Sequence, residues 1–223
     1  MEIKYKKTLL SYKYLVMFDL ASHTTGVCLW SIPDHSPVET RIIRTSGKFK
    51  TESLYNELQK YFDELYKRGI EKKDVLVYQE AMPTQLRGGS STIQTFVALA
   101  KSHAILNLFL LQNEIDFYDD VGVYPASTHA YFKRLVPPPP DQKGVDKDSI
   151  RRYVLSTFPL EEVSLDESDA VFLAMTFVDI KWNNDIDAEV REVKRHKRSL
   201  VSEAAKRDCD EKIRSLMDLK VTF

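Results

Sequence analysis

Four carboxylates lie in or directly beside apolar segments, where an exposed, merely solvated acid would not be expected. Asp19 follows the run YLVMF, and Glu80 follows VLVYQ. Asp166 and Asp169 begin the segment LDESDAVFLAMTF. Negative charge in such surroundings is unfavourable unless it is paired or bound to a cation. An all-oxygen group of this kind suits Mg²⁺, with Mn²⁺ able to substitute, and does not suit zinc.

The spacing of the two aspartates places them on one face of a predicted helix over residues 165–177. They continue an apolar stripe at i, i+3, i+4, i+7, i+8 and i+11, formed by Asp166, Asp169, Ala170, Leu173, Ala174 and Phe177. Helix capping is the alternative, because Ser164 and Glu167 fit the S-x-x-E capping box. Capping explains those two residues, but it does not require both aspartates to share the apolar face. For Asp19, the alternative is a turn residue at the end of a strand.

Four carboxylates are sufficient to hold two metal ions about 4 Å apart. Such a pair orients a water molecule as nucleophile and stabilises the leaving 3′-oxygen of a phosphodiester. The residues therefore favour metal-dependent hydrolysis of nucleic acid. Spacings typical of acyl transfer, P-loop nucleotide hydrolysis or zinc proteolysis (GxSxG, the P-loop or HExxH) do not occur in the sequence.

The elements expected to position these residues alternate in type along the chain. Apolar, β-branched runs bounded by turn residues predict five strands, at residues 14–18, 26–32, 38–45, 75–78 and 121–124. Helical periodicity predicts helices at residues 51–68, 91–113, 127–135, 147–158 and 165–177. This order is typical of an α/β fold with a mixed sheet and helices on both faces. If the first and fourth strands are parallel neighbours, Asp19 and Glu80 meet at one edge of the fold.

Composition excludes several classes of protein. The 223 residues are 43% hydrophobic and 29% charged, which is typical of a globular protein and excludes a disordered or fibrous one. The 32 Lys and Arg against 33 Asp and Glu give a net charge of −1, so any nucleic-acid binding must use local basic patches. The two cysteines, Cys28 and Cys209, are too few and too far apart for a disulfide framework. We expect a reducing, cytoplasmic location and no membrane partner, because Lys101, His103 and Asn107 interrupt the longest apolar stretch.

The composition changes after residue 181. An interruption is predicted by the polar residues Asn183, Asn184, Asp185 and Asp187, and residues 188–218 predict a separate, highly charged helical appendage. We therefore expect a first domain at residues 1–181 and a charged helical C-terminal extension at 182–223. The basic cluster of this extension could track phosphates or could be a solvated face; it comprises Arg191, Lys194, Arg195, Lys197 and Arg198.

Several segments, in order and spacing, resemble the RuvC-type Holliday-junction resolvases of bacteria and their phages. They are YLVMFDLASHTTGVCLW, VLVYQEAM, QTFVALAKSHAILNL, YPASTHAYFKRLV, KDSIRRYVLSTF and LDESDAVFLAMT, within residues 14–178. The resemblance implies an RNase H-like fold and a Mg²⁺-dependent endodeoxyribonuclease that cuts four-way DNA junctions as a homodimer. Its setting would be the cytoplasm of a bacterium or phage-infected cell, or an organelle matrix.

The resemblance also implies roles for individual residues. Asp19, Glu80, Asp166 and Asp169 match the four metal-binding catalytic carboxylates, for two ions per site. Lys133 and Lys147 match lysines near the scissile phosphate, and Lys147 is therefore also a catalytic candidate. Met82 and Arg87 remain in the loop after the fourth strand to contact the junction, because this loop lacks the aromatic wedge usual in the family.

Two features depart from the family. The glycine usually found just after the first aspartate is absent, and the charged extension has no counterpart in the compact bacterial enzymes, which indicates a phage or divergent member. Two alternatives stay open: a related nuclease acting on flaps, branched DNA or RNA–DNA hybrids, and a catalytically silent junction-binding protein. An actin-like or sugar-kinase-like ATPase is disfavoured, because the Asp19 segment is not repeated in the chain.

Overall fold

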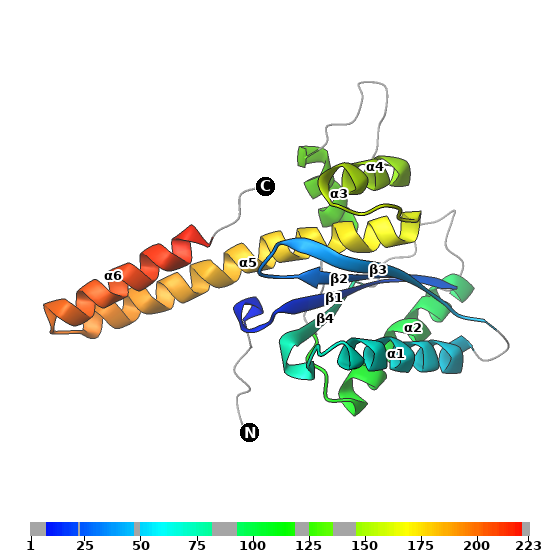
Figure 1. Ribbon diagram of the computed structural model, residues 1–223, viewed down its shortest axis with the longest axis horizontal. Coiled ribbons are helices and arrows are strands. Elements are labelled where there is room, and N and C mark those ends of the chain that lie inside the picture. The colour runs from blue at the N-terminus through cyan, green and yellow to red at the C-terminus, as the bar shows by residue number, and fades with distance from the viewer. Residues whose placement is uncertain are drawn as a thin grey trace. The chain divides into compact units, whose positions relative to one another are not determined.

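The computed structural model describes residues 8–21, 23–46, 50–81, 93–118, 125–135 and 146–219 (Figure 1). Its internal contacts divide the chain into two units. The sheet unit is Tyr12–Thr176, and the hairpin unit consists of Met1–Ser11 and Phe177–Phe223, of which residues 8–11 and 177–219 are described. The domain boundary predicted between residues 181 and 182 falls inside a helix and stays a prediction.

The sheet unit is built on a mixed sheet. Its strands are β1 (Tyr14–Leu20), β2 (Thr24–Ser31), β3 (Ser36–Arg44) and β4 (Val75–Gln79). They lie in the order β3-β2-β1-β4, with β1 antiparallel to β2 and parallel to β4. The predicted α/β class, the three opening strands and the parallel neighbourhood of the first and fourth strands are confirmed.

The expectation of a five-stranded sheet is wrong for the part of the chain that the structure describes, where the sheet has four strands. Among the described residues, an isolated parallel bridge joins Val77 of β4 to Phe117. It consists of two hydrogen bonds, one from the Val77 amide to the Asp116 carbonyl (2.9 Å) and one from the Tyr118 amide to the Val77 carbonyl (3.0 Å). The strand predicted at residues 121–124 lies outside the described residues.

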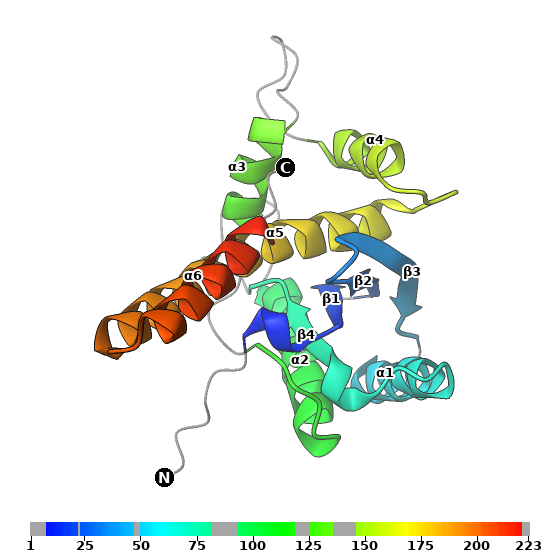
Figure 2. The same cartoon turned by 60° about the vertical axis from the view of Figure 1, so that its left-hand side comes forward.

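Helices cover both faces of the sheet (Figures 1 and 2). On one face lie α1 (Lys50–Lys67) and α2 (Ile93–Gln112), and on the other lie α3 (Pro125–Leu135), α4 (Lys147–Thr157) and the first turns of α5 (Leu165–Ser199). Short 3₁₀ turns at Leu9–Ser11 and Lys72–Asp74 precede β1 and β4. Gly69 follows the end of α1 with a φ of +84°, a conformation that glycine adopts readily.

Alternation along the strands separates the two packed faces. Val16, Phe18, Val27 and Leu29 belong to the cluster that α1 and α2 cover. On the opposite face, the Trp30 ring meets Phe158 edge to face, with centroids 5.3 Å apart. The Asp19 side chain and the Cα hydrogens of Gly26 lie on this second face, which is the face that α5 covers.

The helix α2 combines a buried side with an apolar exposed side. Leu106, Phe109 and Leu110 are buried in the core, whereas Ile93 and Leu111 are exposed by 71% and 64%. Contrary to the sequence-based expectation, α2 is long and apolar enough to cross a membrane by length and composition, with a mean hydropathy of 1.3. A single helix of this kind among the described residues is weak evidence of a membrane span.

The interruption predicted at residues 183–187 is wrong, because α5 continues through it to Ser199. The polar side chains there have partners within the helix or nearby. Asn183 donates to Asp179 Oδ1 at 3.1 Å, and Asp185 is paired with Lys181. The apolar side chains of this segment repeat at helical spacing and are buried; they are Trp182, Ile186, Val190 and Val193.

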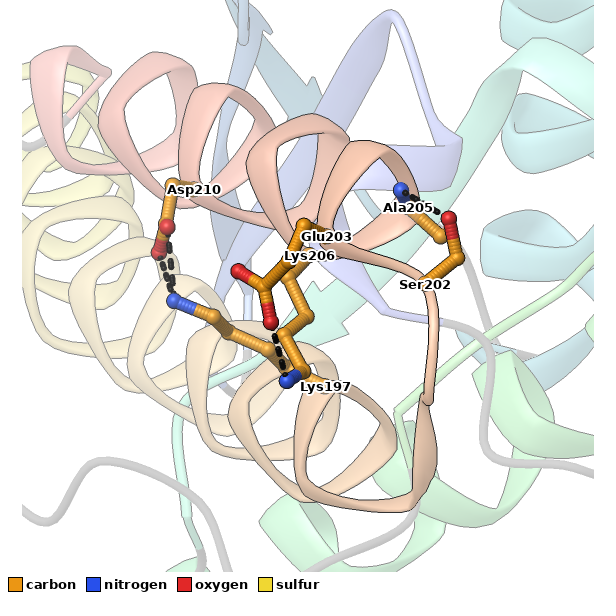
Figure 3. Close-up of polar contacts among 6 residues, drawn as sticks. All are labelled: Lys197, Ser202, Glu203, Ala205, Lys206 and Asp210. Carbon is orange, nitrogen blue, oxygen red and sulfur yellow. Dashed lines mark hydrogen bonds and ion pairs between the residues drawn. The ribbon is translucent and has the colours of Figure 1, made fainter.

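In the hairpin unit, α6 (Glu203–Asp218) runs back along the C-terminal half of α5 (Figures 1 and 2). The Trp182 indole donates to the Leu219 carbonyl at 2.8 Å, and this bond ties the far end of α6 to α5. At the turn, the Ser202 hydroxyl caps α6 by accepting from the Ala205 amide at 3.5 Å (Figure 3). The Leu9 amide donates to Asp185 at 2.7 Å, which fixes the described N-terminal residues to the same unit.

Candidate metal centre

Two of the predicted carboxylates meet at the ends of neighbouring strands. Asp19 is the sixth residue of β1, and Glu80 directly follows β4. The parallel register pairs Phe18 with Gln79, and the Glu80 amide donates to the Phe18 carbonyl at 3.2 Å. This register brings the side chains of Asp19 and Glu80 together, and they share a hydrogen bond.

The other two carboxylates lie in the first turn of α5, and the predicted capping box forms there as well. The Glu167 amide donates to Ser164 Oγ at 3.2 Å, and the Ser164 amide donates to Glu167 Oε2 at 2.9 Å. Capping therefore uses Ser164 and Glu167 and leaves Asp166 and Asp169 available for other contacts. The Asp169 side chain is only 16% exposed, and that of Asp166 is 33% exposed.

Side chains from the sheet hold this helix start in place. The Thr24 hydroxyl donates to Asp166 Oδ2 at 2.9 Å, and the Thr40 hydroxyl donates to Glu167 Oε1 at 3.1 Å. Gly26 lies opposite Asp19 in the β1–β2 ladder. A Cβ atom on Gly26 would lie 2.1 Å from the Asp166 carbonyl oxygen, so the absence of a side chain there lets α5 approach the sheet beside Asp19.

Lys147 joins the group from the first residue of α4. Its Nζ lies 2.6 Å from Asp169 Oδ2 and 3.7 Å from Asp166 Oδ1. Asp146 caps α4 by accepting from the Ser149 amide at 2.6 Å, which fixes the helix start that carries the lysine. Partial burial disfavours the charged ammonium, but the hydrogen bond and charge of Asp169 outweigh it, and the pKa of Lys147 is raised.

The acidic group, by which we mean Asp19, Glu80, Asp166 and Asp169, carries more negative charge than the surrounding residues stabilise. Burial, followed by the charge of Asp169, raises the pKa of Asp19 to about 7. Burial, followed by the charge of Asp19, raises the pKa of Glu80 to about 8. Lys147 opposes both shifts without cancelling them. A cation of higher charge would stabilise the ionised forms of all four acids.

The residues fit a hard divalent cation by the chemistry of the donor set, which consists of carboxylate oxygens alone. In the described part of the chain, no group of three or more His, Cys, Asp or Glu side chains has the arrangement of metal ligands. The Lys147 ammonium lies against the two carboxylates of α5 and supplies positive charge there. A metal ion bound through Asp169 Oδ2 would take the place of the Lys147 ammonium.

The remaining predicted site residues are not part of this group. Lys133 is exposed in the last turn of α3 and, within the described ranges, forms no ion pair with the four acids. Met82 and Arg87 lie outside the described residues. The metal-binding, catalytic and nucleic-acid-binding roles of all these residues stay predictions.

Sequence reasoning did not identify Thr24, Gly26 and Thr40 as parts of the site. Gly26 begins the strand predicted at residues 26–32, and Thr24 lies two residues before it. Threonine is common in and beside strands, so its type gave no indication of a role in the site. One signal was present: glycine within a strand often marks the close approach of another backbone. The two threonines act through contacts with residues more than 120 positions away, which local spacing does not encode.

The mixed sheet and its two helical layers are consistent with an RNase H-like α/β fold, which a comparison with solved structures supports. The yeast mitochondrial Holliday junction resolvase Ydc2 is similar with a TM-score of 0.52 and 13% identity, over 81% of this chain and 82% of its own. At this identity the likeness is one of fold.

Two structures of RuvC from Thermus thermophilus are also similar. In complex with a Holliday junction substrate, RuvC matches with a TM-score of 0.49 and 10% identity, over 74% of this chain and 92% of its own. The other structure gives a TM-score of 0.47 and 11% identity, over 73% and 92%. Neither the family models nor the curated protein sequences give a match to this sequence.

Proposed function

We propose that this protein is a divalent-metal-dependent endodeoxyribonuclease that resolves four-way DNA junctions. The observation that carries the proposal is the convergence of Asp19, Glu80, Asp166 and Asp169 from two strand ends and one helix start, with the pKa values of Asp19 and Glu80 raised. The RuvC-type fold supports it. A catalytically silent relative is disfavoured, because such a protein has no need to keep four mutually repelling acids together.

The four acids would hold Mg²⁺ or Mn²⁺, two ions per site. When bound, the cations would activate water for attack on phosphorus and stabilise the leaving oxygen. Asp19 and Asp169 would be the central ligands, with Glu80 and Asp166 completing the set. Lys147, displaced from Asp169, would place its ammonium against a phosphate oxygen of the DNA.

We also propose that the protein acts as a homodimer through the outer face of α2. Its exposed apolar side chains Ile93, Val97, Leu108 and Leu111 lie on one side of the helix, and Ile93 and Val97 also line a pocket with Leu54 of α1. A row of this kind over a 20-residue helix resembles the seam by which two helices pack together. A second copy of the chain would cover both rows at once, and a four-way junction offers two related cutting positions for such a pair.

The experiment that tests the activity compares four substrates. The purified chain is incubated with a synthetic four-way junction, a flap, an RNA–DNA hybrid and a plain duplex, each with Mg²⁺, with Mn²⁺ and with a chelator. We expect paired nicks in the junction alone, and only with a metal present. If the protein cuts the flap or the hybrid in preference to the junction, the proposed junction substrate is wrong and the protein is a related nuclease.

Asp19→Asn removes one proposed ligand while keeping the shape of the side chain. We expect it to abolish cutting while junction affinity, measured without metal, stays near that of the parent. Asp208→Asn is the matched control, because Asp208 is exposed on α6 and outside the acidic group. Parental cutting by Asp19→Asn would contradict the assignment of the site.

A further inference from the structure

The two helices of the hairpin unit are joined by ion pairs across their interface. Lys197 Nζ lies 2.6 Å from Asp210 (Figure 3), and Lys212 Nζ lies 2.8 Å from Glu189 Oε1. These pairs use cations that face the neighbouring helix. The cations that point away from the interface have a different distribution on each helix.

On α5, four exposed cations near the C-terminal end share one face, and the exposed acid Glu192 lies beside them. Arg191, Lys194, Arg195 and Arg198 stand at i, i+3, i+4 and i+7, so they share one helical face, and all four are exposed. We call them the basic face. Arg195 is paired with Glu192 of its own helix. Within the described residues, Arg191, Lys194 and Arg198 form no ion pair.

On α6, the corresponding outward face alternates in sign. It carries Glu203, Arg207, Glu211, Arg214 and Asp218 at helical spacing. Lys206, beside this face, is paired with Glu203 at 2.7 Å (Figure 3). Mixed signs are typical of a face that only meets water. The outward faces of the two helices therefore differ in charge, and a general need for solubility does not explain why four cations share one face of α5.

We propose that the basic face of α5 binds the sugar–phosphate backbone of double-stranded DNA, as a contact separate from the acidic group. This inference rests on the proposed function, which makes branched DNA the substrate. Seven residues of α-helix rise about 10 Å, a length of duplex that carries about six phosphates. Arginine suits this partner, because its planar guanidinium donates two hydrogen bonds to a phosphate at once. Binding of this kind does not depend on base sequence.

The test removes three charges from each helix in turn. The first variant combines Arg191→Gln, Lys194→Gln and Arg198→Gln, and the matched control combines Lys206→Gln, Arg207→Gln and Arg214→Gln. Both full-length chains lose the same net charge. Fluorescence anisotropy with a labelled duplex and a labelled four-way junction, in chelator and over a series of KCl concentrations, measures affinity without cutting.

We expect the α5 variant to bind both DNAs about tenfold more weakly at low salt, and its slope of log K against log salt to fall by about 2 to 3. The α6 variant should stay within twofold of the parent. A charge-preserving variant, Arg191→Lys with Arg198→Lys, should restore most of the affinity. This rescue separates a loss of phosphate contacts from a loss of folding, which circular dichroism and thermal melting monitor directly.

The two proposals fail in different ways. If the parent cuts no DNA but the α5 variant loses affinity, the basic face is upheld and the nuclease proposal fails. If the parent cuts junctions but the α5 variant binds DNA as tightly as the parent, the basic face is overturned. Equal losses in the α5 and α6 variants would also overturn it, because net charge alone would then explain binding. Unchanged DNA binding with lost binding to a polyglutamate peptide would assign the face to an acidic protein instead.

Discussion

Gly26 and Asp166 approach each other so closely that a Cβ atom at position 26 would lie 2.1 Å from the Asp166 carbonyl oxygen. Gly26 is also the partner of Asp19 in the β1–β2 ladder. One residue without a side chain therefore sets how near the start of α5 can come to the end of β1. In the acidic group, β1 supplies Asp19, and α5, on the other side of this contact, supplies Asp166 and Asp169.

Gly26→Ala should therefore damage both stability and activity. The new methyl group meets backbone and not a flexible side chain, so the start of α5 must move away from the sheet. Overpacking of this kind destabilises a protein by about 1–3 kcal/mol. Urea unfolding and junction cutting are the two measurements. A variant with parental stability and parental cutting would show that α5 does not rest on Gly26.

Thr24 should act as a positioning residue for Asp166. Its hydroxyl donates to Asp166 Oδ2 at 2.9 Å, which orients the carboxylate. Thr24→Val keeps the branched shape and removes this bond, so we expect Mg²⁺ affinity to fall roughly tenfold, as other outer-shell contacts to metal ligands do. Thr24→Ser restores the donor and should recover the affinity.

Calorimetric titration with Mg²⁺ measures this affinity without reference to cutting. Thr40→Val is a useful comparison, because the Thr40 hydroxyl contacts the capping Glu167 and not a proposed ligand. It should lower stability more than metal affinity. Equal metal affinities for Thr24→Val and the parent would remove Thr24 from the site.

The sequence indicates the acids and the strands that carry them because both signals are local. Asp19 and Glu80 follow apolar runs, and the aspartate pair lies on a helical stripe interrupted by no other charge. The missing parts are contacts between distant segments, such as Gly26 with Asp166 and Lys147 with Asp169. No spacing rule predicts these, because they depend on the packing distance between α5 and the sheet.

The break expected at residues 183–187 fails for a related reason. Asn and Asp disfavour helix interiors because their side chains compete for backbone hydrogen bonds. Here Asp185 instead accepts from the Leu9 amide, and Asn183 donates to Asp179. A partner nearly 180 residues away thus makes a helix-breaking residue acceptable, and the apolar stripe from Trp182 to Val193 carries the helix onward.

Asp185→Ala should destabilise the hairpin unit. Asp185 is 7% exposed, and its removal leaves the Leu9 amide without its acceptor and removes the ion pair with Lys181. The expected loss is about 2–4 kcal/mol. Urea unfolding followed by tryptophan fluorescence reports it, because Trp182 lies one turn away on α5. Asp208→Ala on the exposed side of α6 is the control, and an equal effect of both variants would contradict the role of Asp185.

The proposed dimer makes a prediction about α2. Leu108 is 46% exposed in the row of apolar side chains, and Met217 on α6 is exposed to a similar extent, 44%. Leu108→Glu places a charge in the proposed interface, so the mass in solution should fall from two chains to one. Met217→Glu should leave the mass unchanged. Light scattering after size-exclusion chromatography measures both, and a monomeric parent would contradict the dimer outright.

The raised pKa values of Asp19 and Glu80 predict that the metal-free protein loses stability as pH rises. The folded state keeps protons that the unfolded chain releases from about pH 4, so the free energy of unfolding should fall until both acids ionise near pH 7 to 8. The total change is roughly 2–4 kcal/mol, less than two independent shifts would give because the acids interact.

Asp19→Asn combined with Glu80→Gln should flatten this dependence in chelator and make the protein more stable than the parent at pH 8. Saturating Mg²⁺ should reverse the order at pH 8, because it stabilises only the chain that keeps its ionised acids. Denaturant unfolding of both proteins at pH 5 and pH 8, with and without Mg²⁺, measures these free energies of unfolding. A metal-free parent that becomes more stable from pH 5 to pH 8 would show that nearby positive charge already stabilises the ionised acids.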